Sequence, residues 1–352
     1  MTWTRWTISC GSESGSARRP GGCSQRSTCL PPHERRLDGA HGGTMNVCVL
    51  SGGVGGARFL RGLIGVADPV NVSIVGNVAD DIELLGLHVS PDLDSILYTL
   101  TGRSDEERGW GRADESWRAL DTVAELGGDS WFRLGDRDLG LHLVRTELLR
   151  AGLPLSAATA RIAGAFGLEA RLLPATDDPV RTFVETPAGT FPFQTWFVER
   201  AHRDEVDAVH YAGAPEASPG PNVLEAIAAA DVIVLAPSNP YVSIGPILAV
   251  AAIRDALEQR TVPCVAVSPL VGGRAVKGPA DRMLARLAGG TTPAHVAACY
   301  PGLVDALVVD HADAPVELPH GIRPVVTHTL MRDLDAARRL AAVALDAAGA
   351  PA

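Results

Sequence analysis

The chain has 352 residues, of which 46% are hydrophobic, and its formal net charge at pH 7 is −10. This acidic balance argues against nucleic acid or an anionic membrane surface as a partner, and no apolar run approaches the ~20 residues that a membrane span needs. The six cysteines show no paired metal-ligand spacing, so we expect reduced thiols in a cytoplasmic protein.

The N-terminal segment differs from the rest of the chain. Residues 1–44 are rich in Ser, Arg and Gly, and they show neither apolar periodicity nor a signal-peptide core. We expect a disordered extension, or one that is not translated at all, because Met45 stands directly before the first apolar run. A targeting peptide is the weaker alternative. We expect the remainder, 45–352, to form one large domain with an insertion.

Short apolar runs rich in Val, Ile and Leu predict strands that are buried on both faces of a parallel sheet. These runs lie at 46–50, 71–76, 231–236, 263–268 and 306–310, and a last run at 322–330 predicts a further strand before the C-terminal helix. Helical patterns alternate with them at 57–66, 223–230, 245–259, 280–289 and 333–348. This alternation predicts an α/β fold, with a Rossmann-like, doubly wound and mostly parallel sheet.

The alternation breaks in the middle of the chain. Helical stretches at 91–100, 114–126 and 138–151 are followed by strand-like pieces at 181–185 and 190–198. We therefore predict a core formed by 45–90 and 215–352. An inserted α+β subdomain of about 91–214 is expected over the carboxyl ends of the strands, where open α/β sheets bind their ligands.

The stretch "SGGVGGARFLRGL" follows the first strand. It places Gly52, Gly53, Gly55 and Gly56 before a helix, where glycines allow close backbone approach and free N–H groups attract an anion. It lacks the Gly-Lys-Ser/Thr of a P-loop, and Arg58 replaces the third glycine of a dinucleotide fingerprint. The alternative is a tight turn that binds no ligand.

Two more loops follow core strands. The loop "LAPSNPYVSIGPIL" (235–248) offers short polar side chains and a glycine at Ser238, Asn239, Ser243 and Gly245. The loop "VSPLVGGRAVKGPADRM" (267–283) carries two glycines and Lys277, the only lysine of the chain. Each loop alone could be ordinary turn chemistry. Three such loops at one edge of a sheet predict a phosphate-bearing ligand.

Carboxylates gather in "GNVADDIELLGLHVSPDLD". Asp80 and Asp81 follow the second strand, where an acid could bind a ribose hydroxyl or help to hold Mg²⁺. Asp92 and Asp94 fall in the first turn of the predicted helix 91–100. Both could instead serve only to complement the helix dipole.

Charged and aromatic side chains are dense in two further stretches, "RGWGR" (108–112) and "FRLGDRDLGLHLVR" (132–145). The first could stack on a planar ring or form a packed turn. The second could form a solvated capping network or a polar site near a metal or phosphate.

With these motifs in this order, the chain resembles the 2-phospho-lactate transferase (CofD) family of coenzyme F-420 biosynthesis. "SPDLD" with "LYTL" and "LGDRD" are the most specific, and the likeness runs from about Met45 to the C-terminus. The resemblance implies a homodimeric enzyme that uses Mg²⁺. The enzyme would transfer a guanosine-diphosphate-activated three-carbon acid to the deazaflavin alcohol Fo and release GMP. The Arg-rich composition favours the actinobacterial phosphoenolpyruvate transferase branch.

The resemblance also implies roles for residues. Asp94 and Arg133 match family positions that contact Fo. We hypothesise that Asp80 and Asp94 are catalytic and hold the metal or orient the hydroxyl, with Asp81 and Asp92 as further possible ligands. The donor phosphates would bind Gly52, Gly53, Gly55, Gly56, Ser238, Asn239, Ser243 and Gly245.

Two other functions compete with this interpretation. The YvcK-like gluconeogenesis factors, regulators that bind nucleotide sugars, have a similar glycine loop and Asp pair, but we do not expect "SPDLD" or "LGDRD" in them. A nicotinamide-dependent oxidoreductase is disfavoured by Arg58 and by the lack of a catalytic Ser/Tyr/Lys arrangement.

Overall fold

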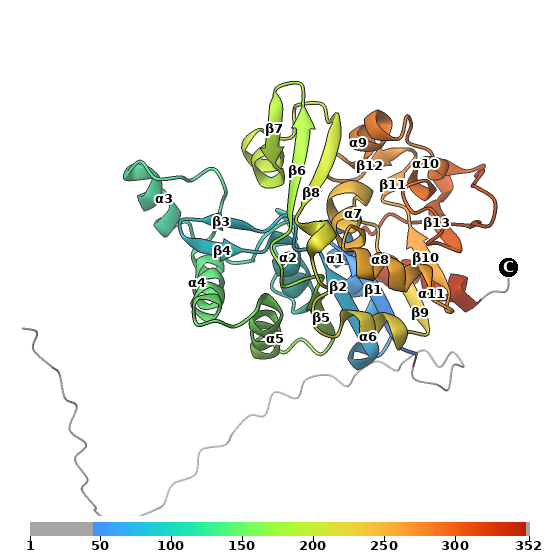
Figure 1. Cartoon of the computed structure of the whole chain (residues 1–352), viewed down its shortest axis with the longest axis horizontal. Coiled ribbons are helices and arrows are strands. Elements are labelled where there is room, and N and C mark those ends of the chain that lie inside the picture. Colours follow the sequence, from blue (N-terminus) through green and yellow to red (C-terminus); the bar gives the residue numbers. More distant parts are fainter. Residues whose placement is uncertain (1–44, 350–352) are drawn as a thin grey trace, which may run out of the picture. The chain divides into compact units, whose positions relative to one another are not determined.

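The central element of the fold is a parallel sheet (Figure 1). The computed structural model describes residues 45–349, so the predicted extension 1–44 lies outside the described residues. Seven strands pair in the order β14-β13-β10-β9-β1-β2-β5, and every pair is parallel. Their bounds are β1 Val47–Ser51, β2 Val72–Gly76, β5 Arg171–Pro174, β9 Val232–Leu235, β10 Cys264–Val267, β13 Ala306–Asp310 and β14 Arg323–Thr327. The predicted parallel α/β fold is confirmed.

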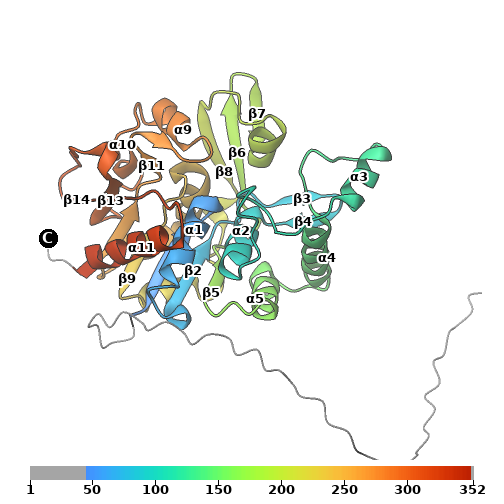
Figure 2. The ribbon, with the colours of Figure 1, turned by 180° about the vertical axis from the view of Figure 1, so that it is seen from behind.

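Helices cover both faces of this sheet. Alternate strand residues point to opposite layers: Val47 and Val49 belong to one apolar core, Cys48 and Leu50 to the other. The first core is closed by α1 Gly53–Leu63, α2 Pro91–Leu100, α5 Leu155–Ala165 and α11 Leu334–Gly349 (Figure 2). The second is closed by α6 Val223–Ala228, α7 Gly245–Leu248, α8 Ala251–Glu258, α9 Ala280–Leu287 and α10 Pro293–Ala297.

The strand order reverses at β1. The chain runs outward from β1 through β2 to β5, and it later returns to place β9 on the other side of β1. Helix α1 leaves β1 toward one face, whereas α7 and α8 follow β9 on the other face. The loops after β1 and β9 therefore diverge at the carboxyl edge, which is the usual ligand position in such sheets.

The predicted insertion of about 91–214 is corrected by the structure. Strand β5 extends the central sheet, and α2 and α5 pack on its core, so these segments do not belong to an insertion. One excursion consists of the hairpin β3 Ile82–Leu84 and β4 Leu87–Val89 with α3 Arg118–Glu125 and α4 Asp136–Arg150. The other is the antiparallel sheet of β6 Arg181–Thr186, β7 Gly189–Pro192 and β8 Ala208–Ala212. The short run "RLLP" of β5 gave too little apolar signal to be predicted.

The helix predicted at 245–259 is broken into two. A π-helical turn, Pro240–Ile244, leads into α7, and α8 follows after a bend of 87°. Pro246 in the first turn of α7 lacks an N–H group and favours a fresh helix start there. Within residues 45–349, no single helix has the length and apolar character to cross a membrane, and only this bent pair passes such a test when its halves are combined.

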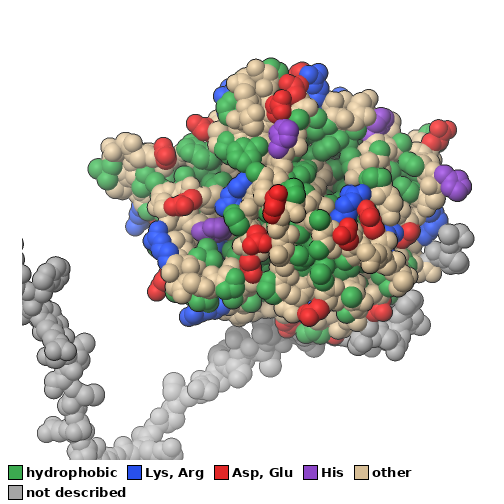
Figure 3. All heavy atoms as spheres, viewed as in Figure 1, with side chains coloured by type: hydrophobic (Ala, Val, Ile, Leu, Met, Phe, Trp, Pro, Cys, Tyr) green, Lys and Arg blue, Asp and Glu red, His purple; other side chains and the backbone are tan. Residues whose placement is uncertain are grey.

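The face shown in Figure 3 carries acidic, basic and histidine side chains that are scattered among apolar ones. They do not gather there into a continuous basic surface. The features that distinguish this protein lie instead in the buried edge of the sheet, where the loops after β1, β2 and β9 meet.

Candidate active site

A buried hydroxyl joins the glycine loop to the loop after β9. The Oγ atom of Ser238 donates to the carbonyl of Gly52 at 2.7 Å and accepts from the Gly52 N–H at 3.3 Å. A Cβ atom at Gly56 would lie 2.5 Å from the same Oγ atom, so only glycine fits there. The two loops at the switch point are therefore held in direct contact.

Gly52 also meets the first turn of α2. A Cβ atom at this position would lie 2.3 Å from Oδ2 of Asp92 and 2.9 Å from Cβ of Ser243. The next residue, Gly53, has a φ of +67°, a conformation that favours glycine. These glycines let the backbone approach Asp92 and Ser243 closely. Part of the dense glycine pattern thus serves packing within the protein.

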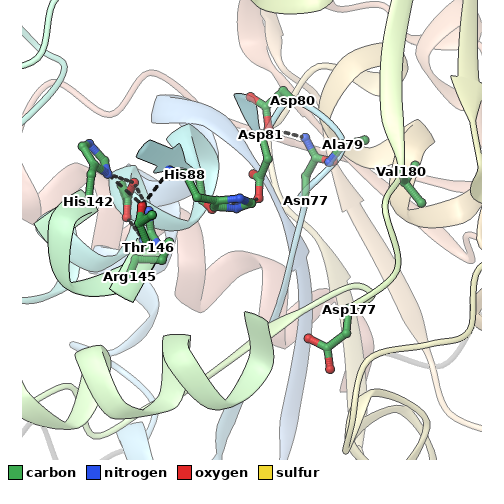
Figure 4. A network of polar contacts seen from close by, with 12 residues as sticks. Asn77, Ala79, Asp80, Asp81, His88, His142, Arg145, Thr146, Asp177 and Val180 are labelled. Atoms are coloured by element: carbon green, nitrogen blue, oxygen red, sulfur yellow. Dashed lines mark hydrogen bonds and ion pairs between the residues drawn. The ribbon is translucent and has the colours of Figure 1, made fainter. Parts of the chain in front are cut away.

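Asn77 lies between two buried carboxylates. Its Nδ2 donates to Oδ1 of Asp80 at 3.2 Å and to Oδ2 of Asp92 at 3.0 Å, and it also approaches the Val242 carbonyl at 3.2 Å. The side-chain nitrogen of Gln194 donates to the other Asp80 oxygen at 3.0 Å. Asp80 and Asp92 are 4% and 6% exposed. The close-up in Figure 4 shows Asn77 joined to the Asp80 carboxylate.

The pKa values of both carboxyls are raised. Burial, followed by the charges of Asp92 and Asp81, raises the pKa of Asp80 well above its ordinary value. Burial raises the pKa of Asp92 to about 6, against the opposing hydrogen bonds from Asn77 and from the backbone of Gly53. Neutral amides are the side-chain partners of the pair, so no positive side chain compensates their charge directly.

Asp81 points to a different set of partners. Its Oδ2 atom accepts from the Ser90 hydroxyl at 2.8 Å and lies 2.9 Å from Nε2 of His88. Its Oδ1 atom is buried and has no hydrogen-bond partner among residues 45–349. The backbone N–H of His88 in turn donates to the Thr146 hydroxyl, which ties this hairpin to α4.

Asp94 is bound by an arginine. Both terminal nitrogens of Arg145 donate to its two oxygens, one of them at 2.9 Å, and the Arg145 side chain is almost completely buried. His142 lies beside them on α4, with Nδ1 at 3.8 Å from Asp94 (Figure 4). Although Asp92 and Asp94 share one helical turn, they face different elements.

Comparisons with known proteins decide the family. The family described as "2-phospho-L-lactate transferase CofD" matches residues 47–346. This chain belongs to the CofD family. A relative of this CofD-family protein, named "Phosphoenolpyruvate transferase" in Streptomyces griseus, is 46% identical, over 86% of this chain and 98% of its own length. A Mycobacterium tuberculosis relative of the same name is 40% identical, over 87% and 99%. The predicted resemblance is confirmed, and the CofD-family protein is a transferase.

The fold has a solved counterpart. A Bacillus halodurans protein of the UPF0052 family superposes on the CofD-family chain with a TM-score of 0.57 and 18% identity. The match covers 86% of this chain and 99% of that protein. At this identity the likeness shows the fold alone.

Several predicted donor-site residues of the CofD-family protein have protein contacts of their own. The side chain of Asn239 accepts from the Tyr241 N–H and caps the π-helical turn. A Cβ atom at Gly245 would lie 2.3 Å from the Tyr211 hydroxyl, and one at Gly55 would lie 2.7 Å from the Pro237 carbonyl. These three contacts explain the residue types without a ligand.

The loop 267–283 contributes differently from the prediction. It forms the hairpin of β11 Leu270–Val271 and β12 Arg274–Ala275. The N–H groups of Gly272 and Gly273 donate to the carboxylate of Asp313 at 3.1 and 2.7 Å. A carboxylate of the protein therefore occupies the place that a phosphate was expected to take.

Arg133 is exposed on the segment before α4. Its guanidinium lies over the ring of Trp117, 4.5 Å from the ring centroid. The structure thus leaves Arg133 at the surface, whereas Asp94 is buried in the seam between α2 and α4.

Asn77 and Gln194 were not predicted from the sequence. Asn77 stands at the end of β2 within "GNVADD", where its position after a core strand was an available signal. Gln194 lies between Phe193 and Trp196 in an aromatic stretch, and nothing local indicates that it reaches Asp80.

The buried carboxylates of Asp80 and Asp92 suit a magnesium ion whose remaining ligands are water and a substrate phosphate. Within residues 45–349, no group of three or more His, Cys, Asp or Glu side chains is arranged to hold a metal alone. Mg²⁺ commonly takes only one or two protein carboxylates, together with water and substrate phosphates. The buried, uncompensated pair of Asp80 and Asp92 provides such a donor set.

Proposed function

We propose that this CofD-family transferase moves a phosphoenolpyruvyl group from a guanosine-diphosphate-activated donor to the deazaflavin alcohol Fo, a step of coenzyme F-420 biosynthesis. The ribityl oxygen of Fo forms a bond to the phosphorus that carries the enolpyruvyl group. The bond from this phosphorus to the oxygen of GMP breaks, and the hydroxyl proton passes to solvent. The products are GMP and dehydro-F-420-0. A phospholactyl donor, which would give F-420-0, is the variant to be tested.

The observation that carries this proposal is the uncompensated pair of Asp80 and Asp92 beside the switch-point loops. Transfer of a phosphoryl group requires in-line positioning and neutralised charge more than a strong nucleophile. A buried carboxylate pair at the switch point of a parallel sheet is suited to a phosphate–cation complex. The shared name of the relatives supports the phosphoenolpyruvyl group in particular, and it favours the transferase over a nucleotide-sugar-binding regulator.

In the proposed mechanism, Asp80 and Asp92 would hold Mg²⁺, and Asn77 keeps both carboxylates in place through one amide group. When bound, the ion would neutralise charge on the transferred phosphate and on the departing GMP. The start of α1 and the Ser243 side chain would contact the donor phosphates, because both lie beside Asp92. Asp94 would orient Fo from the α2–α4 seam, and Arg133 would provide positive charge at the surface near it.

Mass spectrometry of the product tests the proposal. Purified protein, Mg²⁺ and Fo are incubated with the enolpyruvyl or the lactyl donor, and GMP release is followed in parallel. We expect the product that is about two daltons lighter, the enolpyruvyl one, to form faster. The variant Asp92→Asn is assayed in the same way and should release GMP more slowly. Asp121→Asn, a change of the same type at an exposed position of α3, is its matched control. Stabilisation by UDP-sugars without any GMP release would contradict the proposal and favour the regulator.

We further propose that the protein acts as a homodimer in the cytoplasm. The family resemblance supports the dimer, and the reduced-thiol composition supports the compartment. Sedimentation equilibrium at several protein concentrations tests the assembly. A single species of about 37 kDa, the mass of one chain, would contradict it.

A further inference from the structure

The carboxylates at this edge of the sheet are not equivalent, although their burial is. Asp80, Asp81, Asp92 and Asp94 are 4%, 2%, 6% and 5% exposed. In residues 45–349, only one buried lysine or arginine accompanies them, and it is Arg145. Its position therefore decides which of the acids is neutralised within the protein.

Arg145 lies on α4 and forms its ion pair with Asp94. Both terminal nitrogens donate to Asp94, so each oxygen of that carboxylate has a charged partner. Nδ1 of His142 lies 3.4 Å from Arg145, and the other ring nitrogen lies 3.2 Å from Asp138, which also accepts from the Tyr98 hydroxyl. These contacts fix α4 against α2.

None of the other three acids has an arginine or lysine partner among residues 45–349, although His88 lies 2.9 Å from Asp81. Asp80 and Asp92 accept from the neutral amides of Asn77 and Gln194. The buried Oδ1 atom of Asp81 accepts no hydrogen bond in the described part of the chain. A buried carboxylate oxygen without a hydrogen-bond partner, on the residue next to Asp80, is a second observation that points to a ligand at this edge of the sheet.

A buried ion pair is seldom a net source of stability, because desolvation offsets the attraction between the charges. The effect of the Asp94–Arg145 ion pair on the site is electrostatic, because the two side chains together carry no net charge. The ion pair neutralises Asp94, so this carboxylate does not require a bound cation.

We infer that Arg145 is a positioning residue for the cation site. By binding both oxygens of Asp94, it confines a single divalent cation to Asp80 and Asp92 and occupies the place that a second cation would need. This inference rests on the proposed function for the use of a cation, and it replaces the predicted ligand pair of Asp80 and Asp94 by Asp80 and Asp92.

Binding of Mn²⁺ to the full chain, followed by electron paramagnetic resonance with and without GDP, tests the inference without a turnover assay. We expect one Mn²⁺ per wild-type chain. The double variant Asp94→Asn with Arg145→Met should keep this stoichiometry, with a dissociation constant within threefold of wild type. Arg145→Lys, which retains the charge, should also bind one ion. Arg145→Met alone should bind a second Mn²⁺ or bind the first at least tenfold more tightly.

Two variants calibrate the measurement. Asp80→Asn should weaken Mn²⁺ binding at least tenfold, whereas Arg150→Met, on the exposed end of the same helix, should leave it unchanged. A tenfold loss in the double variant would overturn the inference, because Asp94 would then be a ligand. If Arg145→Met does not fold, Mn²⁺ binding by the double variant and by Arg145→Lys still tests the inference. Absence of Mn²⁺ binding by wild type would overturn the inference, while product analysis would still test the transferase.

Discussion

Asp92 and Asp94 lie in the same first turn of α2 and are equally buried, yet their surroundings are opposite. Asp92 faces the glycine loop and accepts from the amide of Asn77. Asp94 faces α4 and accepts from the guanidinium of Arg145. Burial alone therefore does not assign a role to a carboxylate. The charge of the opposing element decides whether the acid is neutralised internally or left for a ligand.

The largest effect is expected on the Asp94 side. Arg145→Met should lower the free energy of unfolding by about 3–5 kcal/mol, because the buried charge of Asp94 loses its partner. Adding Asp94→Asn should restore most of this loss. Urea unfolding measures both, with Arg150→Met as a control that should change stability by less than about 0.5 kcal/mol. Equal destabilisation in the single and double variants would show that Asp94 carries no charge there.

On the Asp92 side the effect should appear in turnover. Asp92→Asn should reduce GMP release roughly 10²–10³-fold, because a charged ligand of the transferring phosphate–cation complex is removed. Its stability without metal should not fall, since an uncompensated buried charge is removed as well. Initial rates and thermal melting are compared with those of Asp121→Asn. Undiminished turnover would show that Asp92 has no part in the mechanism and does not differ in role from Asp94.

The pH dependence of the metal-free protein tests the same contrast. The native pKa of Asp92 is raised to about 6 from an ordinary 3.8, so the folded state binds a proton more tightly than the unfolded state. Its contribution to stability is therefore fully present below pH 4 and is lost as the pH rises through 6, by at most about 3 kcal/mol. Unfolding in EDTA should show this loss relative to Asp92→Asn, and Mg²⁺ should reduce it. Parallel pH profiles for the two proteins would contradict the expectation.

A smaller effect is expected for Gly52→Ala. The new methyl group would lie 2.3 Å from Asp92, so the carboxylate or the loop must move, at a cost of about 1–3 kcal/mol. GMP release should fall because Asp92 is displaced. Gly140→Ala is the matched control, since nothing lies within 4 Å of a Cβ atom at this helical position. If Gly52→Ala and Gly140→Ala behave alike, Asp92 does not depend on the close approach of this loop.

Much of the fold was predictable because its signals are local. Each Val- and Ile-rich run forms a strand of the central sheet, but α1 begins at Gly53, within the glycine stretch and four residues before the helix predicted at 57–66. The insertion boundaries failed because β5 is only Arg171–Pro174, too short for a periodic pattern. Helix 245–259 failed for a tertiary reason, since the chain bends sharply between α7 and α8.

The candidate site was predictable in part. The sequence placed Gly52, Ser238 and Asp80 after neighbouring strands, and parallel strands bring such residues to one edge. It did not separate Asp92 from Asp94, nor did it indicate the contact between Gln194 and Asp80. That contact joins residues 114 positions apart and depends on how the small antiparallel sheet packs.

By itself, the sequence determined a doubly wound α/β sheet, its polar loops at the carboxyl edge and, through its motifs, the family. Hydrophobic periodicity and turn chemistry act over a few residues, so they can be read from the chain directly. The tertiary structure alone decided which acid is neutralised. Asn77 reaches Asp92 across 15 positions, and Arg145 reaches Asp94 across 51, because α2 packs between the glycine loop and α4. The charge partners of a buried side chain are set by such packing, which no local pattern encodes.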